Sequence, residues 1–133
     1  MLPLSRNLMK LRVIVAESYP DFLHIFVSLL STEFEVVATA VNGESALRCI
    51  RHWRPDVVIL AMPGADGFEL IKKVTSCAPR LGVVICSLES DPELVEVALQ
   101  VGAQGYVLKT QIATDLVPAV KSVASGRRFV FRG

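Results

Sequence analysis

The sequence DVVILAMPGADG, residues 56–67, joins a run of apolar residues to a Pro-Gly turn and decides the fold. Val57 to Ala61 is apolar and rich in β-branched side chains, which is typical of a strand covered on both faces. Residues 62–64 then indicate a turn. No acid stands at the strand end, and Asp66 is the first carboxylate beyond it. Because ligand chemistry in parallel sheets gathers at the carboxyl ends of the strands, the missing acid bears on function as well as on fold.

Outward from this stretch, short apolar runs alternate with segments whose apolar residues recur at helical spacing. The predicted strands cover residues 12–16, 34–40, 57–61, 82–86 and 106–108. The predicted helices lie around residues 22–30, 46–53, 67–77, 93–101 and 114–124. Strands that are apolar on both faces and joined by helices predict a parallel sheet sandwiched between helices, an α/β fold. Residues 1–10 show no periodicity and are expected to be a loose leader, with the folded domain over residues 11–126.

Length and composition bound the classes of function. The chain has 133 residues, of which 52% are hydrophobic and 20% charged, as expected for one domain with a sizeable core. A formal net charge of +1 is too small to attract nucleic acid or anionic membranes electrostatically. The cysteines Cys49, Cys77 and Cys86 lack disulfide or metal-ligand spacing and are interpreted as small core residues in a reducing compartment. No apolar run reaches the roughly 18 residues of a membrane helix, and we expect a cytoplasmic protein.

Several motifs lie at characteristic separations along the chain. They are RVIVAESYPDF (12–22), VATAVNGESAL (37–47), RPDVVIL (54–60), MPGADGFEL (62–70) and VGAQGYVLKT (101–110). With them the chain resembles, over about residues 11–131, the receiver domain of bacterial two-component response regulators of the LuxR/FixJ-type subgroup. The resemblance implies a flavodoxin-like, doubly wound fold: a five-stranded parallel sheet in the order 2-1-3-4-5 with five helices. It also places residues 127–133 at the start of a linker to a helix-turn-helix output domain, so DNA would be reached only through a domain absent or removed from this chain.

The resemblance further implies a phosphoryl-transfer site at the carboxyl ends of the strands. In the family, an aspartate ending strand 3 accepts a phosphoryl group from a histidine kinase, and two acids after strand 1 help hold Mg²⁺. A lysine after strand 5 and a hydroxyl after strand 4 contact the phosphoryl group, and an aromatic residue on strand 5 reports the state. The matching positions here are Glu17 and Ser18 for the acids, Lys109, Ser87 and Tyr106 for the other roles, and Ala61 for the acceptor.

The sequence can be aligned with the family in two ways around the acceptor position, and neither alignment places a carboxylate there. Counting forward from Asn42-Gly43 places Ala61 there, with a following loop two residues shorter than in the family. Counting back from Met62 instead places Ile59 there. The resemblance therefore implies a receiver domain whose phosphoacceptor aspartate is missing.

Neighbouring acids replace the acceptor poorly. Asp56 lies roughly 16 Å from Ala61, at about 3.3 Å per residue, and on the opposite face of the strand. Asp66 is the remaining candidate for a surrogate acceptor, although a turn or helix-capping role also explains it. Because Glu17 beside Ser18 is a poor anchor for an octahedral cation, we expect weak or absent Mg²⁺ binding, with no functional metal site and no cofactor.

The other pocket residues each allow two interpretations. Lys109 is either a relic phosphate ligand or, as we favour, the partner of Glu17 in an ion pair that neutralises a partly buried ammonium. Ser87 either satisfies a loop amide or acts as a switch hydroxyl. Tyr106 is either a packed core aromatic or a residue that reports to a partner surface.

The first predicted helix has a wide apolar arc. Its core side is assigned to Phe22, Ile25, Phe26 and Leu29. A second apolar flank consists of Leu23, Val27 and Leu30. This flank is either a wide buried face or an interface, together with the last helix, for a protein partner or a second copy of the chain.

Taken together, these features favour an atypical, or pseudo, receiver domain. Such a module controls transcription by dimerisation or partner docking, without aspartyl phosphorylation, and is not an enzyme. One alternative is a phosphorylatable receiver that accepts a phosphoryl group from a histidine kinase on Asp66. Another is a small-molecule sensor that uses the emptied acidic cleft.

Overall fold

Strands and helices alternate along the chain, as the apolar pattern predicts, in the computed structural model, which describes residues 10–61 and 65–132. The strands are β1 (Arg12–Ala16), β2 (Glu35–Ala40), β3 (Val57–Leu60), β4 (Gly82–Ser87), β5 (Gly105–Leu108) and β6 (Phe129–Val130). The helices are α2 (Pro20–Leu30), α3 (Gly43–Trp53), α4 (Ala65–Cys77), α5 (Pro92–Gln100) and α6 (Ile112–Ala124), with a 3-10 turn η1 (Lys109–Gln111) before the last. The predicted leader lies almost wholly outside the described residues.

All strands pair in parallel in one sheet with the order β2-β1-β3-β4-β5-β6. The flavodoxin-like order of the first five strands is therefore confirmed. The predicted count of five is one strand short, because Phe129–Val130 adds a sixth at the edge. The amide of Phe129 donates to the Gln104 carbonyl at 3.0 Å, and that of Phe131 to the Tyr106 carbonyl at 3.1 Å. A two-residue strand is too short to show the period-2 alternation from which strands are predicted.

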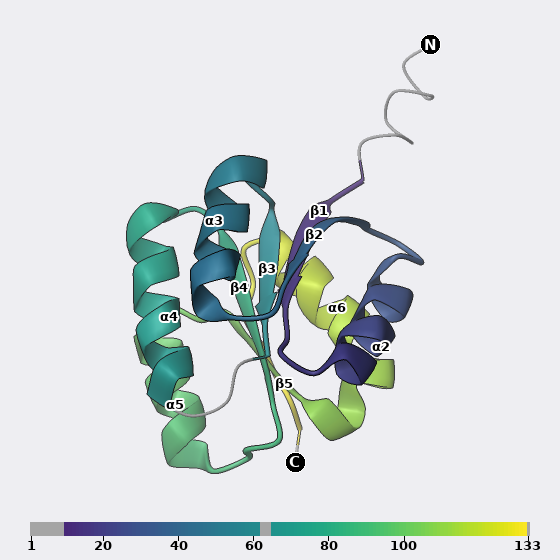
Figure 1. Cartoon of the computed structure of the whole chain (residues 1–133). Coiled ribbons are helices and arrows are strands. Elements are labelled where there is room, and N and C mark those ends of the chain that lie inside the picture. Colours follow the sequence, from purple (N-terminus) through teal and green to yellow (C-terminus); the bar gives the residue numbers. More distant parts are fainter. Residues whose placement is uncertain (1–9, 62–64, 133) are drawn as a thin grey trace.

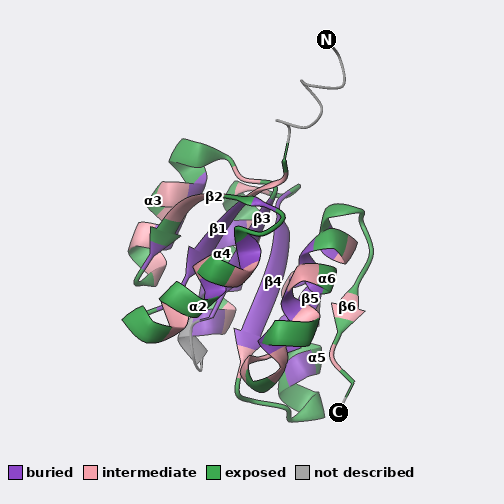
Figure 2. Cartoon of the chain, turned by 90° about the vertical axis from the view of Figure 1, so that its right-hand side faces the viewer, coloured by how far each residue is buried: buried purple, intermediate pink, exposed green. Residues whose placement is uncertain are grey.

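Helices cover both faces of the sheet (Figure 1). One layer holds α3, α4 and α5, and the other holds α2 and α6. Successive strand residues point to opposite layers, so Val58 joins the first apolar cluster while Val57 and Ile59 join the second. The strands β1, β3, β4 and β5 are accordingly buried along almost all of their length, whereas β2 and β6 at the two edges of the sheet keep exposed residues (Figure 2). Double-sided burial explains why the strand around Val57 is apolar at every position.

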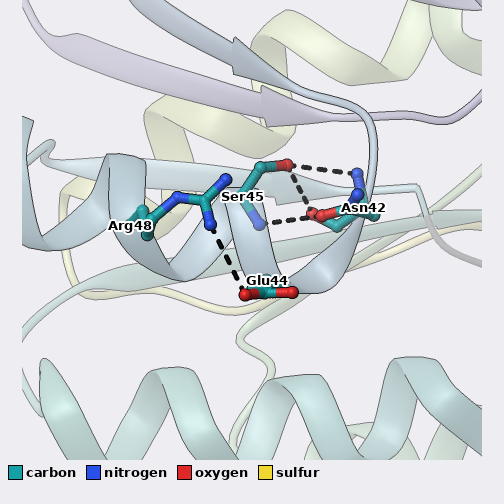
Figure 3. A network of polar contacts seen from close by, with 4 residues as sticks. All are labelled: Asn42, Glu44, Ser45 and Arg48. Atoms are coloured by element: carbon teal, nitrogen blue, oxygen red, sulfur yellow. Dashed lines mark hydrogen bonds and ion pairs between the residues drawn. The ribbon is translucent and has the colours of Figure 1, made fainter.

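The α3 helix is defined by local sequence at both ends. The Asn42 side chain accepts a hydrogen bond from the Ser45 amide at 2.8 Å, and Ser45 Oγ accepts from the Asn42 amide at 3.3 Å (Figure 3). This reciprocal cap satisfies amides that the first helical turn leaves free. The helix ends before Pro55, as predicted, with Arg54 in the left-handed conformation at φ 47°.

The predicted faces of α2 need correction. Phe26 and Leu30 are both fully buried, whereas Ile25 is 45% exposed. Leu30 is therefore a core residue and not part of an interface. The reason is that the buried stripe is centred between Phe26 and Leu30, which lie one turn apart, so Ile25 falls at its outer edge. Leu23 and Val27 are half-buried, and Leu23 packs against the α2/α6 side of the core.

Only one of the cysteines is the predicted core residue. Cys86 is buried on β4, Cys49 is half-buried, and Cys77 is exposed at the end of α4. The exposed histidines His24 and His52 lie on helices. Within the described residues, no helix is long and apolar enough to cross a membrane.

Candidate functional site

The residues predicted to form the site meet at the carboxyl edge of the sheet. Glu17 follows β1, Ala61 follows β3, Ser87 ends β4 and Lys109 follows β5. The parallel register brings these ends together, with Ala16 beside Leu60 and Ser87 beside Leu108. Backbone hydrogen bonds extend the sheet one residue further, since the Ala61 amide donates to the Ala16 carbonyl at 2.9 Å.

A buried ion pair occupies the centre of this edge. Lys109 Nζ lies 2.7 Å from Glu17 Oε1, and the two side chains are 11% and 1% exposed. The other carboxylate oxygen, Oε2, accepts a hydrogen bond from the Tyr19 amide at 3.1 Å. The ammonium also lies 4.7 Å from the centroid of the Phe22 ring, a cation–π contact. The predicted pairing of Lys109 with Glu17 is thus present, and both carboxylate oxygens are engaged.

Cys86 lies close to this pair, and its thiol is unreactive. Burial raises the pKa of the Cys86 thiol well above its ordinary value of 9.0. The positive charge of Lys109 lowers this pKa in part, and the negative charge of Glu17 raises it further. The thiol therefore stays protonated. Since the thiolate is the nucleophile and metal ligand, Cys86 contributes packing and no reactivity at this edge.

The end of β3 presents a methyl group. Ala61 is 1% exposed and belongs to the apolar cluster on the α2/α6 side of the sheet. Asp66 is the second residue of α4, but its side chain lies outside the described residues. The prediction that Asp66 serves as a surrogate acceptor therefore stays a prediction.

Ser87 and Tyr106 both bind the loop between β4 and α5. Ser87 Oγ accepts a hydrogen bond from the Glu89 amide at 3.0 Å, and the Tyr106 hydroxyl donates to the Glu89 carbonyl at 2.7 Å. Tyr106 is 3% exposed, so its ring points inward. Burial raises the pKa of the Tyr106 phenol above its ordinary value of 10.0, while the nearby Ser87 hydroxyl acts in the opposite direction. Both side chains act here as loop anchors.

Sequence reasoning missed two members of this arrangement. Glu89 contributes backbone atoms, which carry no signature in the sequence. Phe131 packs against Tyr106 with ring centroids 5.8 Å apart and lies in the segment predicted to be a linker. The apolar run Phe129-Val130-Phe131 is the sequence signal for an edge strand, but it is too short to show the alternation from which strands are predicted.

The donor set for a divalent cation is small. Mg²⁺ favours octahedral oxygen coordination anchored by carboxylates. Of the described residues that meet here, Glu17 supplies a carboxylate whose oxygens already face Lys109 and the Tyr19 amide, and Ser18 supplies an exposed hydroxyl. Across the residues that the structure describes, no three His, Cys, Asp or Glu side chains gather in a way that could hold a metal ion. The described donors do not fit Mg²⁺.

The sequence matches known proteins over most of its length. The family model described as response regulator receiver domain matches residues 13–121. The probable transcriptional regulatory protein NarL of Mycobacterium tuberculosis is 38% identical over 125 residues, which cover 91% of this chain and 58% of that protein. The transcriptional regulatory protein DegU of Brevibacillus brevis is 31% identical over 125 residues, covering 91% of this chain and 53% of the relative.

A solved structure agrees with the sequence matches. The signal receiver domain of the putative response regulator NarL from Mycobacterium tuberculosis superposes with a TM-score of 0.81 at 38% identity, covering 89% of this chain and 98% of that one. The chain spans little more than half the length of the curated relatives named above. With its fold, its sheet order and the matched residues 13–121, the chain belongs to the response regulator receiver domain family, in its NarL/LuxR-type branch.

Proposed function

We propose that this chain is an atypical receiver domain that works by recognition, without phosphorylation of an aspartate at the end of β3. The observation that carries the proposal is Ala61, a buried methyl group at the position where the family places its acceptor. An alanine side chain has no oxygen with which to form an acyl phosphate. The module would then change its output through abundance, a protein partner or a second copy of itself.

The state of the surrounding charges supports this proposal. An aspartyl phosphate needs a cation and a free ammonium to offset its charge. Here the Lys109 ammonium is neutralised by Glu17 at 2.7 Å in a buried setting. We therefore propose weak or absent Mg²⁺ binding and no catalytic role in phosphoryl transfer. The same ion pair weighs against a small-molecule sensor in this cleft, since the charges that would attract a ligand already satisfy each other.

Partner docking would take place on the outer surface, with α2 as the favoured element. Tyr19 is 66% exposed just before this helix and Ile25 is 45% exposed on it. The relatives named above are transcriptional regulators, so we propose that the partner surface controls a DNA-binding output domain outside this chain. Ile25→Glu should weaken self-association in sedimentation velocity, whereas His24→Glu, on an exposed position of the same helix, should not. Equal sedimentation of both variants and wild type, with self-association present, would remove α2 from the proposal.

Phosphotransfer is tested by incubating the protein with acetyl phosphate and Mg²⁺ and recording the intact mass. The proposal predicts no phosphoryl adduct. The rival, a receiver that uses Asp66, predicts an adduct that disappears in Asp66→Asn and persists in Asp56→Asn. Asp56 is a suitable control because its carboxylate accepts a hydrogen bond from the Arg12 amide, at the amino-terminal start of the sheet.

A further inference from the structure

A cleft of about 880 Å³ lies at the amino-terminal edge of the sheet, at the end opposite Glu17 and Lys109. Its walls come from the end of α3, the segment between α4 and β4, and the end of α6. In Figure 1 this is the upper edge, where β1 begins and α3 ends. The size falls within the range of roughly 300–1,000 Å³ that is common for small-molecule sites. Neither the family resemblance nor the proposed function uses this region.

The cleft is lined by cations without anionic partners. Arg51, Arg54 and Arg80 line it, are exposed, and make no ion pair within the described part of the chain. The carboxylate in the lining belongs to Asp56, whose Oδ2 accepts a hydrogen bond from the Arg12 amide at 2.8 Å. An adjoining hollow of about 380 Å³ shares Arg51 and adds Lys73, which makes no described ion pair either. Positive charge therefore exceeds negative charge across both hollows.

Arginines elsewhere on the same helix behave differently. Arg48 of α3 is paired with Glu44 at 3.5 Å (Figure 3), whereas Arg51 and Arg54, one and two turns on, are not. Arg54 also adopts φ 47°, and in the described residues it alone combines a side chain with a left-handed backbone. Glycine or asparagine is favoured at such a helix end, so an arginine there carries a conformational cost. A costly residue that lines a cleft points to a role in binding.

We propose that this cleft binds an organic phosphate. The guanidinium groups of Arg51, Arg54 and Arg80 would take the phosphoryl group, because their planar donor pairs match its oxygens two at a time. The apolar walls, which include Ile50 and Leu81, would contact the rest of the molecule. Binding here would link the ends of α3 and α4, so a bound ligand would stabilise the fold from the side opposite the ion pair.

These arginines also have a purely structural interpretation, which the experiment must separate from binding. The helices α3 and α4 both end at this edge, and cations offset the partial negative charge at helix carboxyl ends. That role predicts lower stability when an arginine is replaced, but no affinity for anions. A binding site predicts saturable occupancy by the phosphate.

The test is a ¹H–¹⁵N NMR titration of the whole chain with ADP and, separately, with inorganic pyrophosphate at low ionic strength. We expect saturable shifts at residues of the cleft, with ADP binding more tightly than pyrophosphate because of the apolar walls. Arg80→Ala, in a segment outside the helices, should weaken ADP binding about tenfold or more, since it removes a charge-assisted contact. Arg48→Ala, on α3 but outside the cleft, should leave the affinity unchanged.

A second readout uses the exposed thiol of Cys77, which also lines the cleft. Bound ADP should slow its alkylation by iodoacetamide at least severalfold, measured by peptide mass spectrometry, in wild type and not in Arg80→Ala. The proposal is overturned if neither phosphate gives saturable shifts, or if Arg48→Ala weakens binding as much as Arg80→Ala. It is also overturned if a tetraglutamate peptide binds while both phosphates do not, because the site would then recognise acidic peptides.

Discussion

Breaking the ion pair at the carboxyl edge with Lys109→Met should destabilise the fold strongly at neutral pH. The variant keeps most of the lysine stem but leaves the Glu17 carboxylate, 1% exposed, without its cation. At 2.7 Å the direct attraction is about 6 kcal/mol for an effective dielectric constant of about 20. Because desolvation offsets part of this attraction, removing one partner of a buried pair costs about 3–5 kcal/mol. That is a large share of the roughly 5–15 kcal/mol by which a domain of this size is stable.

Urea unfolding followed by circular dichroism measures this loss. With a slope of about 2 kcal/mol per M, the midpoint should fall by roughly 1.5–2.5 M. The matched control is Lys121→Met, which breaks the pair of Lys121 with Glu33, whose side chains are 56% and 44% exposed. An exposed pair of this kind is worth less than about 1 kcal/mol. The double variant Glu17→Gln, Lys109→Met should recover part of the stability, since no buried charge remains.

A loss below about 1 kcal/mol in Lys109→Met, equal to that in Lys121→Met, would refute the reasoning. It would mean that Glu17 gains water or another partner once Lys109 is removed. In that case the Lys109 ammonium of the wild type could leave Glu17 for an incoming phosphoryl group, and the ion pair would no longer support a recognition mechanism.

Two further predictions concern the edge formed by β5 and β6. Since burial raises the pKa of Tyr106 in the folded state, its contribution to stability should be fully present below the unfolded value of 10.0 and lost as pH rises through the higher folded value. Wild type should therefore lose more stability than Tyr106→Phe between about pH 9 and pH 11 in urea titrations. Equal losses would contradict a raised pKa of Tyr106 in the folded state. Phe131→Ala should cost about 1–2 kcal/mol, because it removes the ring that packs 5.8 Å from Tyr106. Amide exchange at Tyr106 should accelerate in that variant, and unchanged exchange would show that β6 does not depend on the ring.

The fold could be predicted because its main signals are local. The unbroken apolar run after Asp56 predicts a strand buried on both sides, and all residues of β3 are indeed buried. Pro55 predicts the end of α3, and Asn42-Gly43 predicts a break after the preceding strand, where the structure has the reciprocal cap of α3. The sixth strand escaped prediction because Phe129–Val130 has two residues, which are too few to establish a period.

Side-chain orientation was harder to predict than the elements. On α2, spacing identified the apolar residues but not the centre of the buried stripe, so Leu30 and Ile25 were assigned to the wrong faces. The pairing of Glu17 with Lys109 could be predicted because each residue directly follows a strand, and all strands of a parallel sheet end at the same edge. The arginine cleft could not, because its walls join segments around residues 50–56, 77–82 and 123–124 that are far apart in sequence.

The most direct test of a receiver that works without an acceptor at β3 is a ¹H–¹⁵N NMR titration with beryllofluoride and Mg²⁺. Beryllofluoride mimics a phosphoryl group only when a carboxylate binds it. The absence of an acid at Ala61 predicts no saturable shift at the amides of Ala61, Ser87, Tyr106 or Lys109 at millimolar Mg²⁺. Saturable shifts at these amides that vanish in Asp66→Asn would contradict the account, because a working acceptor would then be present.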